Sequence, residues 1–377
     1  MRILRVAQKL YPDVKGGAPY HVHAMSRDQA AMGHDVTVVS LRYDPDAPHL
    51  EQRDEYTVIR YDPQISVLGN DISSGLAQYI RDADDFDVVH AHSHLYFATN
   101  LAALKRRLGD IPLTITNHGL YSQTAPRSIQ NLYLETLGKW TFNSADLIFC
   151  YTEGVRQRFR SRGIKPPIQV ISNGIDHTRF TPDGPTSDLV TNDGPVVLSV
   201  IRLVGGKRPK DAIEAVSRLR ETYPDVHLYL AGDGYLREEL EQYVSNAGLQ
   251  ETVSLLGNVA YDEMPRLYRS CDVLLLPSEE EAGAPRVVLE AMATEKPFVI
   301  TDMPQTTELL TDLGTTVPVG DPDAMVAAIE ALLSDSDRHA DAGLAGRELV
   351  EQEFNWQKTA EETTRCLEGL GTGESRR

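Results

Sequence analysis

The stretch DVVHAHSHLYFATNLAALKRRLGDIPLTITNHG, residues 87–119, holds two runs rich in β-branched residues with an amphipathic segment between them. The runs DVVHAHS and LTITNHG are typical of buried strands, and the helical period of residues 97–108 predicts a helix. A strand–helix–strand unit of this kind joins two parallel strands. The stretch therefore predicts a parallel sheet covered by helices.

The same alternation extends along the whole chain with one interruption. Further strands are expected at RILRVA, DVTVVSL, YTVIRYD, LIFCYT and IQVISNG, and a further helix over residues 20–32. Residues 181–195, TPDGPTSDLVTNDGP, break the pattern with the composition of a linker. Strands resume at VVLSVIRL, VHLYLAGDG, VSLLGN, DVLLLPS, PFVITD and TTVPVG.

This pattern predicts an α/β fold with two doubly wound, Rossmann-like domains. We expect an N-terminal domain over residues 1–182, a linker over 183–195, a C-terminal domain over 196–355, a final helix over 356–370 and a frayed tail over 371–377. Open parallel sheets bind ligands at the carboxyl ends of their strands, so with two such sheets we expect the site in a cleft between the domains.

Composition excludes several classes of protein. The net charge is −18, from 55 acidic and 37 basic residues, and such a chain repels phosphate backbones, so we expect no nucleic-acid partner. Only nine of the bases are Lys, and an acidic, Lys-poor surface suits either a salt-rich cytoplasm or an ordinary acidic protein. With no run of 18 apolar residues and no signal-peptide pattern, we expect a cytoplasmic location. Cys150, Cys271 and Cys366 are far apart, which indicates reduced thiols rather than a disulfide framework.

Candidate site residues in the first domain follow predicted strands. Gly16 and Gly17 precede a helix, where paired glycines either form a plain turn or let the backbone approach a ligand. His118 follows the strand LTIT, and is either a structural histidine or a ligand contact. His90, His92 and His94 alternate, so all three are expected on one side of a strand; no carboxylate accompanies them, and we expect no metal.

Candidate residues of the second domain are charged. Arg202 ends a strand and Lys207 follows a Gly-rich turn, an arrangement that either binds a diphosphate or forms a solvated loop. In the stretch PSEEEAGAPRVVLEAMA, residues 277–293, Pro285 fits the first turn of a helix. Glu290 on that helix suits a pair of sugar hydroxyls, because a carboxylate accepts two hydrogen bonds.

Taken in order, these motifs resemble those of family-4 glycosyltransferases, which are retaining enzymes of the GT-B fold. The resemblance extends to about residue 370 and rests on Gly16-Gly17, GHDVTVVS, DVVHAHS, NHG, VISNGID, Arg202 to Lys207, LAGDG, LLGNV and LPS…PRVVLEAMA. It implies transfer of a hexose from a nucleotide sugar, UDP-linked by preference with GDP-mannose as the alternative, to a saccharide or lipid-linked acceptor. It also implies that the leaving diphosphate helps to deprotonate the acceptor hydroxyl on the same face.

The resemblance assigns roles residue by residue. Arg202 and Lys207 would bind the diphosphate and stabilise the leaving group, and His118 would contact the transferred sugar. The implied donor-binding positions are Gly16, Gly17, Gly232, Val259, Pro285, Arg286, Val287 and Glu290, with Glu290 on the ribose and Val259 against the base. No metal or other cofactor is implied, because the cations and the helix N-terminus at residues 285–287 take that role.

The sequence departs from the family pattern at three places. The family usually has Glu eight residues before Glu290, where this chain has Ala282; either Glu281 takes its place, or the site works without that contact or has lost activity. Arg208 stands where glycine is common. Glu295 and Lys296 replace the usual small residue before Pro297.

Two other functions stay open beside glycosyl transfer. Ala282 is compatible with a non-catalytic nucleotide-sugar-binding or partner subunit, and the fold would also suit a nucleotide-sugar epimerase that needs no acceptor. Separately, the basic run VRQRFRSRGIKPP, residues 155–167, is either a solvated helix face or a peripheral contact with anionic lipid on the inner membrane face.

Overall fold

The computed structural model describes residues 1–67, 69–121, 126–279, 281, 284–303, 306, 310 and 313–371. Backbone contacts divide the chain into two compact units. The N-terminal unit comprises residues 1–172 and the chain from Lys358 onward, and the C-terminal unit comprises residues 173–357.

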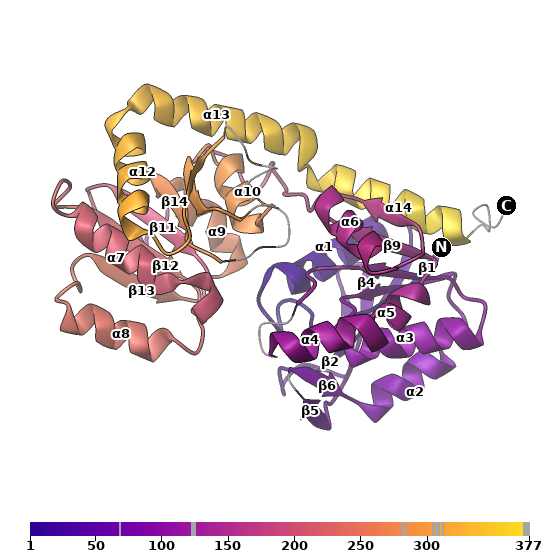
Figure 1. Ribbon diagram of the computed structural model, residues 1–377. Helices are drawn as coiled ribbons and strands as arrows, with labels where there is room; N and C mark the ends of the chain where they lie inside the picture. Colours follow the sequence, from indigo (N-terminus) through magenta and orange to yellow (C-terminus); the bar gives the residue numbers. More distant parts are fainter. Residues whose placement is uncertain are drawn as a thin grey trace. The chain divides into compact units, whose positions relative to one another are not determined.

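The N-terminal unit is built on a sheet of eight strands in the order β10–β9–β8–β7–β1–β2–β4–β3 (Figure 1). All neighbours are parallel except β3, which is antiparallel to β4. The strands are β1 (Arg2–Val6), β2 (Asp35–Leu41), β3 (Leu50–Arg53), β4 (Tyr56–Tyr61), β7 (Val88–His92), β8 (Leu113–Thr116), β9 (Leu147–Cys150) and β10 (Ile168–Val170). A separate hairpin joins β5 (Ile65–Val67) to β6 (Asn70–Ile72).

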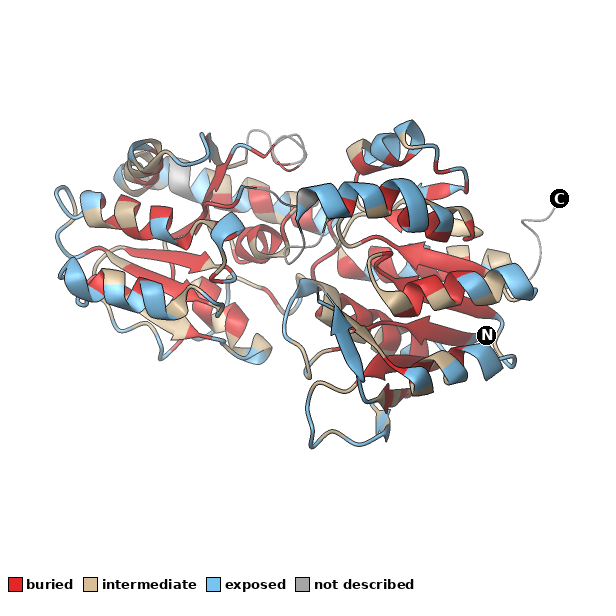
Figure 2. Cartoon of the chain, turned by 60° about the horizontal axis from the view of Figure 1, so that its bottom comes forward, coloured by how far each residue is buried: buried red, intermediate tan, exposed pale blue. Residues whose placement is uncertain are grey.

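Helices cover both faces of this sheet because successive strand residues are apolar on both sides. Val36 and Val38 of β2 belong to one hydrophobic core, and Val39 and Leu41 to another. Figure 2 shows these strands buried while the helices are buried along only part of their surface. The helical segments are α1 (Gly17–Ala31), α2 (Ser74–Asp82), α3 (Phe97–Leu108), α4 (Arg127–Tyr133), the π-helical turn η1 (Leu134–Gly138), α5 (Lys139–Asn143), α6 (Glu153–Ser161) and α14 (Trp356–Gly371).

The last helix, α14, packs on the N-terminal unit although it ends the described chain. Leu367 is fully buried in the same core as Val22 of α1, and Gln29 donates a hydrogen bond to Thr364 at 2.9 Å. Burial of these side chains outside water fixes the helix to this unit.

The C-terminal unit has a wholly parallel sheet in the order β13–β12–β11–β14–β15–β16. Its strands are β11 (Val196–Val200), β12 (His227–Ala231), β13 (Val253–Gly257), β14 (Val273–Leu276), β15 (Phe298–Thr301) and β16 (Thr315–Val317). Its helices are η2 (Gly205–Lys207), α7 (Pro209–Leu219), α8 (Arg237–Asn246), η3 (Tyr261–Glu263), α9 (Met264–Arg269), α10 (Arg286–Ala293), α12 (Pro322–Ser334) and α13 (Ser336–Glu353).

The boundary between the units lies earlier than the sequence predicted. Ile175 and Phe180 are fully buried in the core of the C-terminal unit, so residues 173–182 pack there and not in the first domain. The expected linker over 183–195 also packs on this unit: the Ser187 amide donates to Ser270 Oγ at 2.8 Å, and the Thr191 amide to Tyr229 Oη at 3.1 Å.

The predicted α/β class with two Rossmann-like units is confirmed, and the three cysteines are free thiols. The strands β3, β5 and β6 were not predicted. Leu50 of β3 and all three residues of β5 are exposed, so these strands lack the buried apolar run that marks the others. None of the described helices combines the length and the apolar character needed to cross a bilayer.

Candidate functional site

The strand order of the C-terminal sheet reverses between β11 and β14, and charged residues follow both strands. In a parallel sheet such a reversal opens a crevice at the carboxyl ends of the strands. Arg202 comes two residues after β11 and is exposed, and Lys207 ends the short helix η2. Glu281 comes from the segment after β14 and forms an ion pair with Lys207. The structure therefore brings two of the predicted residues together at the reversal.

The Lys207 side chain is nearly buried where it meets Glu281. Lys207 is only 9% exposed, which is low for a lysine whose ammonium must be solvated or paired. The Glu281 carboxylate supplies that partner. An anion that bound Lys207 would have to share the ammonium with Glu281 or displace it.

Arg208 occupies a position that favours glycine. Its φ of 49° and ψ of 47° lie in the left-handed region, which side chains other than Gly adopt at a cost. The guanidinium forms an ion pair with Asp211 on the first turn of α7 and donates to Glu279 at 3.1 Å. Glycine could adopt this left-handed turn without side-chain support, whereas here the bonds of Arg208 to Asp211 and Glu279 stabilise it. The same bonds engage the Arg208 guanidinium with carboxylates.

Gly232 lets the backbone after β12 pack closely against the segment that carries Arg202. It follows β12 with a φ of 136°, and a Cβ added there would lie 1.9 Å from the carbonyl oxygen of Ile201. Gly234 approaches Leu203 in the same way, with its added Cβ 2.3 Å from the carbonyl oxygen. The AGDG turn therefore supports residues 201–203, which carry Arg202, so a contact with a ligand is not needed to explain these glycines.

Glu290 lies on α10 and is almost fully buried. Its carboxylate accepts hydrogen bonds from Tyr268 Oη at 2.8 Å, from Tyr261 Oη at 3.3 Å and from Arg286 Nε at 2.9 Å. Burial raises the pKa of Glu290, while Arg286 and the two tyrosines favour its ionised form. Three protein donors thus already surround the carboxylate that was predicted to hold a ribose.

Three other predicted donor residues lie at the start of α10: Pro285 is its N-cap residue, and Arg286 and Val287 are in its first turn. Val259 follows β13 and packs half-buried against the core of the C-terminal unit. Glu280, Ala282 and Gly283 lie outside the described residues, so the effect of Ala282 on this loop is not described.

The N-terminal sheet reverses its order between β1 and β7. Gly16, with a φ of 140°, precedes α1, and Gly17 is its first residue; both are exposed. Their position after β1 places the N-terminus of α1 at this reversal, where its amide groups favour an anion.

His118 follows β8, next to β7, and its two ring nitrogens are both engaged. Its Nε2 lies 2.9 Å from His92 Nδ1, and its Nδ1 lies 2.6 Å from Tyr151 Oη. The ring of His21 from α1 packs edge-on against it, with ring centres 5.1 Å apart. Burial lowers the pKa of His118 to about 4, so the ring is neutral near pH 7.

The expectation that His90, His92 and His94 face one side of a strand is wrong for His94. The strand β7 ends at His92, and Ser93 has a φ of 64°, which turns the chain. The His94 ring then packs on Phe142, with ring centres 4.5 Å apart, while His90 and His92 stack beside each other at 4.4 Å. Within the described residues no cluster of three or more His, Cys, Asp or Glu side chains is arranged to hold a metal ion.

Sequence reasoning missed three tyrosines. Tyr151 immediately follows β9, and its place at the carboxyl end of a predicted strand was a usable signal. Tyr261 and Tyr268 precede α10 in the sequence by more than a helix length and meet Glu290 only through tertiary packing. No local pattern could have indicated that contact.

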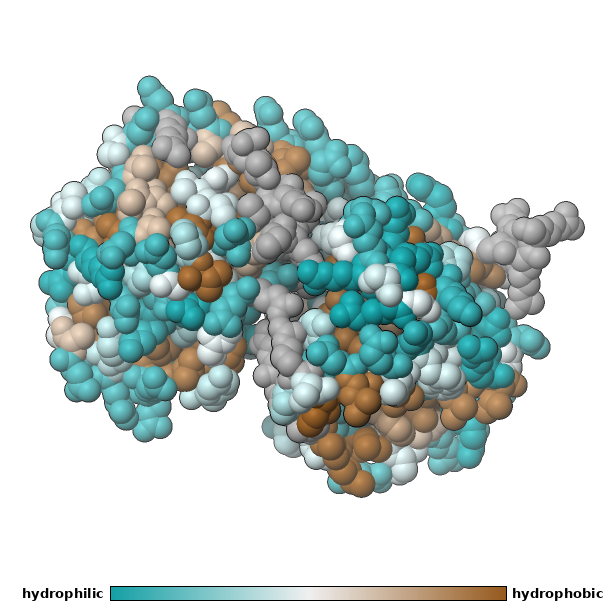
Figure 3. All heavy atoms as spheres, viewed as in Figure 1, coloured by the Kyte–Doolittle hydropathy of each residue, from teal (hydrophilic) through white to brown (hydrophobic). Residues whose placement is uncertain are grey.

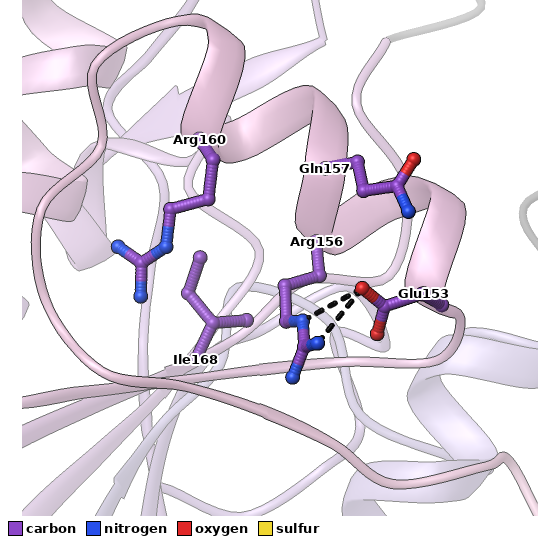
Figure 4. Close-up of a pocket in the computed structure, with 5 residues that line it drawn as sticks. All are labelled: Glu153, Arg156, Gln157, Arg160 and Ile168. Carbon is purple, nitrogen blue, oxygen red and sulfur yellow. Dashed lines mark hydrogen bonds and ion pairs between the residues drawn. The ribbon is translucent and has the colours of Figure 1, made fainter.

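A pocket of about 400 Å³ lies at the helix α6 of the N-terminal unit. Figure 3 shows hydrophilic side chains over this helix, and Figure 4 shows Arg156 and Arg160 beside Ile168 of β10. Arg156 pairs with Glu153 at 2.8 Å, and Arg160 donates to the carbonyl oxygen of Ile164, also at 2.8 Å. The basic run of the sequence thus forms a cationic helix face on an acidic protein.

Two family models match the chain in succession. The model described as Glycosyltransferase Family 4 matches residues 15–179, and the model described as Glycosyl transferases group 1 matches residues 186–349. A glycogen synthase of Mycobacterium tuberculosis is 28% identical over 99% of this chain and 96% of its own length. A GDP-mannose-dependent alpha-(1-6)-phosphatidylinositol monomannoside mannosyltransferase of Mycolicibacterium smegmatis is 26% identical over 95% and 96%.

Solved structures share the fold. A sucrose-phosphate synthase from Thermosynechococcus elongatus superimposes with a TM-score of 0.81 at 20% identity, over 99% of each chain. Anabaena HepE in complex with UDP and glucose superimposes with a TM-score of 0.80 at 22% identity, over 98% of this chain and 100% of that one.

The close approach at Gly232 generates a stability prediction. We expect Gly232→Ala to lower the thermal midpoint, because the added methyl group meets the Ile201 carbonyl and the positive φ is strained, each at a cost of about 1–3 kcal/mol. Gly206→Ala is the matched control, since no atom lies within 4 Å of its added Cβ. Equal midpoints for the two variants by differential scanning calorimetry would show that Gly232 does not support the 201–203 segment.

Proposed function

Because the chain belongs to the family-4 glycosyltransferases of the GT-B fold, we propose that it moves a hexose from a nucleoside-diphosphate sugar to a hydroxyl group of a saccharide or lipid-linked acceptor, with retention at the anomeric carbon. The observation that carries the proposal is the pairing of Lys207 with Glu281 at the strand-order reversal, with Arg202 exposed beside the same turn.

In this proposal Arg202 and Lys207 bind the diphosphate. As the bond between the sugar and the diphosphate breaks, negative charge develops on the leaving oxygen, and the two cations stabilise this charge more than they stabilise the ground state. The leaving diphosphate in turn accepts the proton of the acceptor hydroxyl on the same face of the sugar. No metal ion or other cofactor is required by this arrangement.

Glu281 has two tasks in the proposal. Before the donor binds, it neutralises Lys207, which would otherwise be a nearly buried, unpaired charge. When the diphosphate takes its place on Lys207, the released carboxylate turns to the hydroxyls of the sugar, the contact that the family usually makes from the following position. Glu290 receives the ribose at the cost of the 3.3 Å bond from Tyr261, the longest of its three.

The choice of donor rests on the relatives. UDP is favoured because HepE has been solved with UDP, with UDP and glucose, and with UDP-glucose, and GDP-mannose is the alternative because the Mycolicibacterium smegmatis relative depends on it. Val259 lies against the base in either case. A lipid-linked acceptor is supported by two further relatives that act on phosphatidylinositol.

Nucleotide binding tests the donor site. In molar KCl we expect one of UDP, GDP or ADP, and not NAD, to raise the thermal midpoint, since a ligand at a hundred times its Kd stabilises by about 2.7 kcal/mol. The shift should survive EDTA and disappear in Arg202→Ala and Lys207→Ala, whereas Arg220→Ala, another exposed arginine of the unit, should keep it. A shift with NAD alone, or no shift with any of the diphosphates, would refute the proposed donor site.

Two further outcomes distinguish the alternative functions. Binding of a nucleotide sugar without sugar transfer would favour the non-catalytic subunit, and conversion of the donor in the absence of an acceptor would favour the epimerase.

The exchange at Lys207 makes a separate prediction. Glu281→Gln should bind the bare nucleoside diphosphate about 3- to 10-fold more tightly, because the carboxylate no longer competes for the ammonium, and should transfer sugar at least about tenfold more slowly. Glu279→Gln is the matched control, because Glu279 pairs with Arg208 instead. Isothermal titration and initial rates measure both effects; equal affinities for the Glu281→Gln and wild-type proteins would contradict the exchange.

We further propose that α6 contacts anionic lipid, which would bring the enzyme to a lipid-linked acceptor. Five cations lie on or just after this helix in a chain of net charge −18: Arg156, Arg158, Arg160, Arg162 and Lys165. The segment after α6 is joined to α5, because the Lys165 amide donates to Asn143 Oδ1 at 2.8 Å. Trp140 of α5 is exposed, as the aromatic residues of membrane-contacting surfaces are.

Vesicle sedimentation tests this contact. Each basic residue near an anionic surface contributes about 1 kcal/mol, so Arg156→Glu with Lys165→Glu should lower binding to phosphatidylglycerol vesicles by at least about 30-fold. The double variant Lys210→Glu with Arg220→Glu in the C-terminal unit makes the same change of net charge and should bind as the wild type does. Equal binding to neutral phosphatidylcholine vesicles would rule out the electrostatic contact.

A further inference from the structure

The turn that carries Lys207 contains two consecutive glycines. Gly205 and Gly206 precede Lys207 in the short helix η2, and both glycines are exposed. Glycine has no side chain to pack and more backbone freedom than any other residue, so neighbouring segments have to hold such a turn in place. Because Lys207 follows directly, the position of its ammonium group depends on how firmly the turn is held.

On one side, the segment after β12 pairs with the segment after β11. The Leu203 amide donates to the carbonyl oxygen of Asp233 at 3.0 Å, and the carbonyl oxygen of Leu203 accepts from the Leu236 amide at 3.1 Å. Leu203 is thus bonded to the neighbouring segment through both of its backbone groups, two residues before the glycine pair.

Tyr235 extends this pairing to the glycine turn with its side chain. Its hydroxyl oxygen accepts a hydrogen bond from the Gly205 amide at 3.0 Å. A Cβ added at Gly205 would lie 3.3 Å from that oxygen, so the glycine leaves room for the hydroxyl group to approach. The Tyr235 side chain is 77% exposed, and burial therefore does not explain its position, whereas the bond to Gly205 does.

On the other side, the segment after β14 holds the same turn. The Glu279 amide donates to the carbonyl oxygen of Gly206 at 3.0 Å, and Glu281 pairs with the Lys207 ammonium. In the exchange proposed above, the diphosphate replaces Glu281 on Lys207, so this side loses one of its two bonds when the donor binds. The bond from Gly205 to Tyr235 does not involve the ammonium group and persists through the exchange.

We propose that Tyr235 is a positioning residue of the diphosphate site: its hydroxyl group holds Gly205, and through the turn the ammonium group of Lys207, in place while the diphosphate replaces Glu281. The inference rests on the proposed function, which supplies the diphosphate. All the groups involved belong to the C-terminal unit.

The variant Tyr235→Phe removes the hydroxyl group and keeps the exposed ring. We expect the Kd of the bare nucleoside diphosphate to rise about 3- to 10-fold, the effect of one lost hydrogen bond. The thermal midpoint of the unliganded protein should not change, because the side chain is exposed. Tyr243→Phe is the matched control, since Tyr243 packs through its ring, against the core and with Lys210 Nζ 4.7 Å from the ring centre. Equal Kd values for Tyr235→Phe and the wild-type protein would overturn the proposal.

A double-mutant cycle with Lys207→Ala separates positioning from direct contact. In isothermal titration at millimolar nucleotide, Tyr235→Phe should cause little further loss of affinity in the Lys207→Ala protein, because it acts through Lys207. An undiminished loss in that protein would show that the hydroxyl group acts on the nucleotide without Lys207, and would overturn the positioning role.

The hold on Lys207 can also be measured without any ligand. Acylation by an N-hydroxysuccinimide ester, followed by mass spectrometry, should modify Lys207 about 3- to 10-fold faster in Tyr235→Phe than in the wild-type protein, because one bond to the turn is lost. The exposed Lys210 serves as the internal reference. Equal rates at Lys207 would overturn the inference whether or not the protein transfers sugar. Faster modification in a protein that binds no diphosphate would refute the proposed function and leave the hold of Tyr235 on the turn established.

Discussion

Two adjacent parallel strands whose following helices cover opposite faces of the sheet leave their carboxyl-end loops apart, and ligands enter between those loops. The N-terminal sheet has this reversal between β1 and β7, and the C-terminal sheet has it between β11 and β14. At the first, His21 near the start of α1 packs against His118, whose ring is neutral near pH 7 because burial lowers its pKa to about 4; at the second, Lys207 meets Glu281. The same topology thus places neutral rings at one reversal and paired charges at the other.

Much of this arrangement was predictable because its signals are local. DVTVVSL forms β2 over its full length, and the helical period of residues 97–108 coincides with α3. Parallel strands that are buried on both faces have nearly continuous apolar runs, which are a strong local signal. For the same reason LEQR, at the sheet edge with Leu50 exposed, carried no signal. The positive φ of Ser93, which separates His94 from His92, is a property of the folded turn and not of the alternating pattern.

The geometry of the candidate site was predictable only in part. The sequence placed Arg202 and Lys207 after a strand and Glu290 on a helix, as the structure does, because these positions depend on local patterns. Their partners were not predictable, because the Lys207–Glu281 pair and the bonds from Tyr261 and Tyr268 to Glu290 join segments far apart in sequence. Those partners alter the chemistry: a cation expected to be available for a phosphate is paired, and a carboxylate expected to face a ribose is nearly buried.

The negative net charge of the chain affects how it could bind an anionic nucleoside diphosphate. A net charge of −18 repels a nucleoside diphosphate at long range, and the repulsion is weakened as salt shortens the screening length from about 10 Å at 0.1 M to about 3 Å at 1 M. An ion pair at contact distance and shielded from water is screened much less. Salt therefore removes the opposition of the surface while leaving the local attraction of Lys207 in place. An acidic protein can in this way bind an anionic substrate without a broad basic surface. The condition is that the cations of the binding site are paired with carboxylates that an incoming diphosphate can replace, as Glu281 is paired with Lys207.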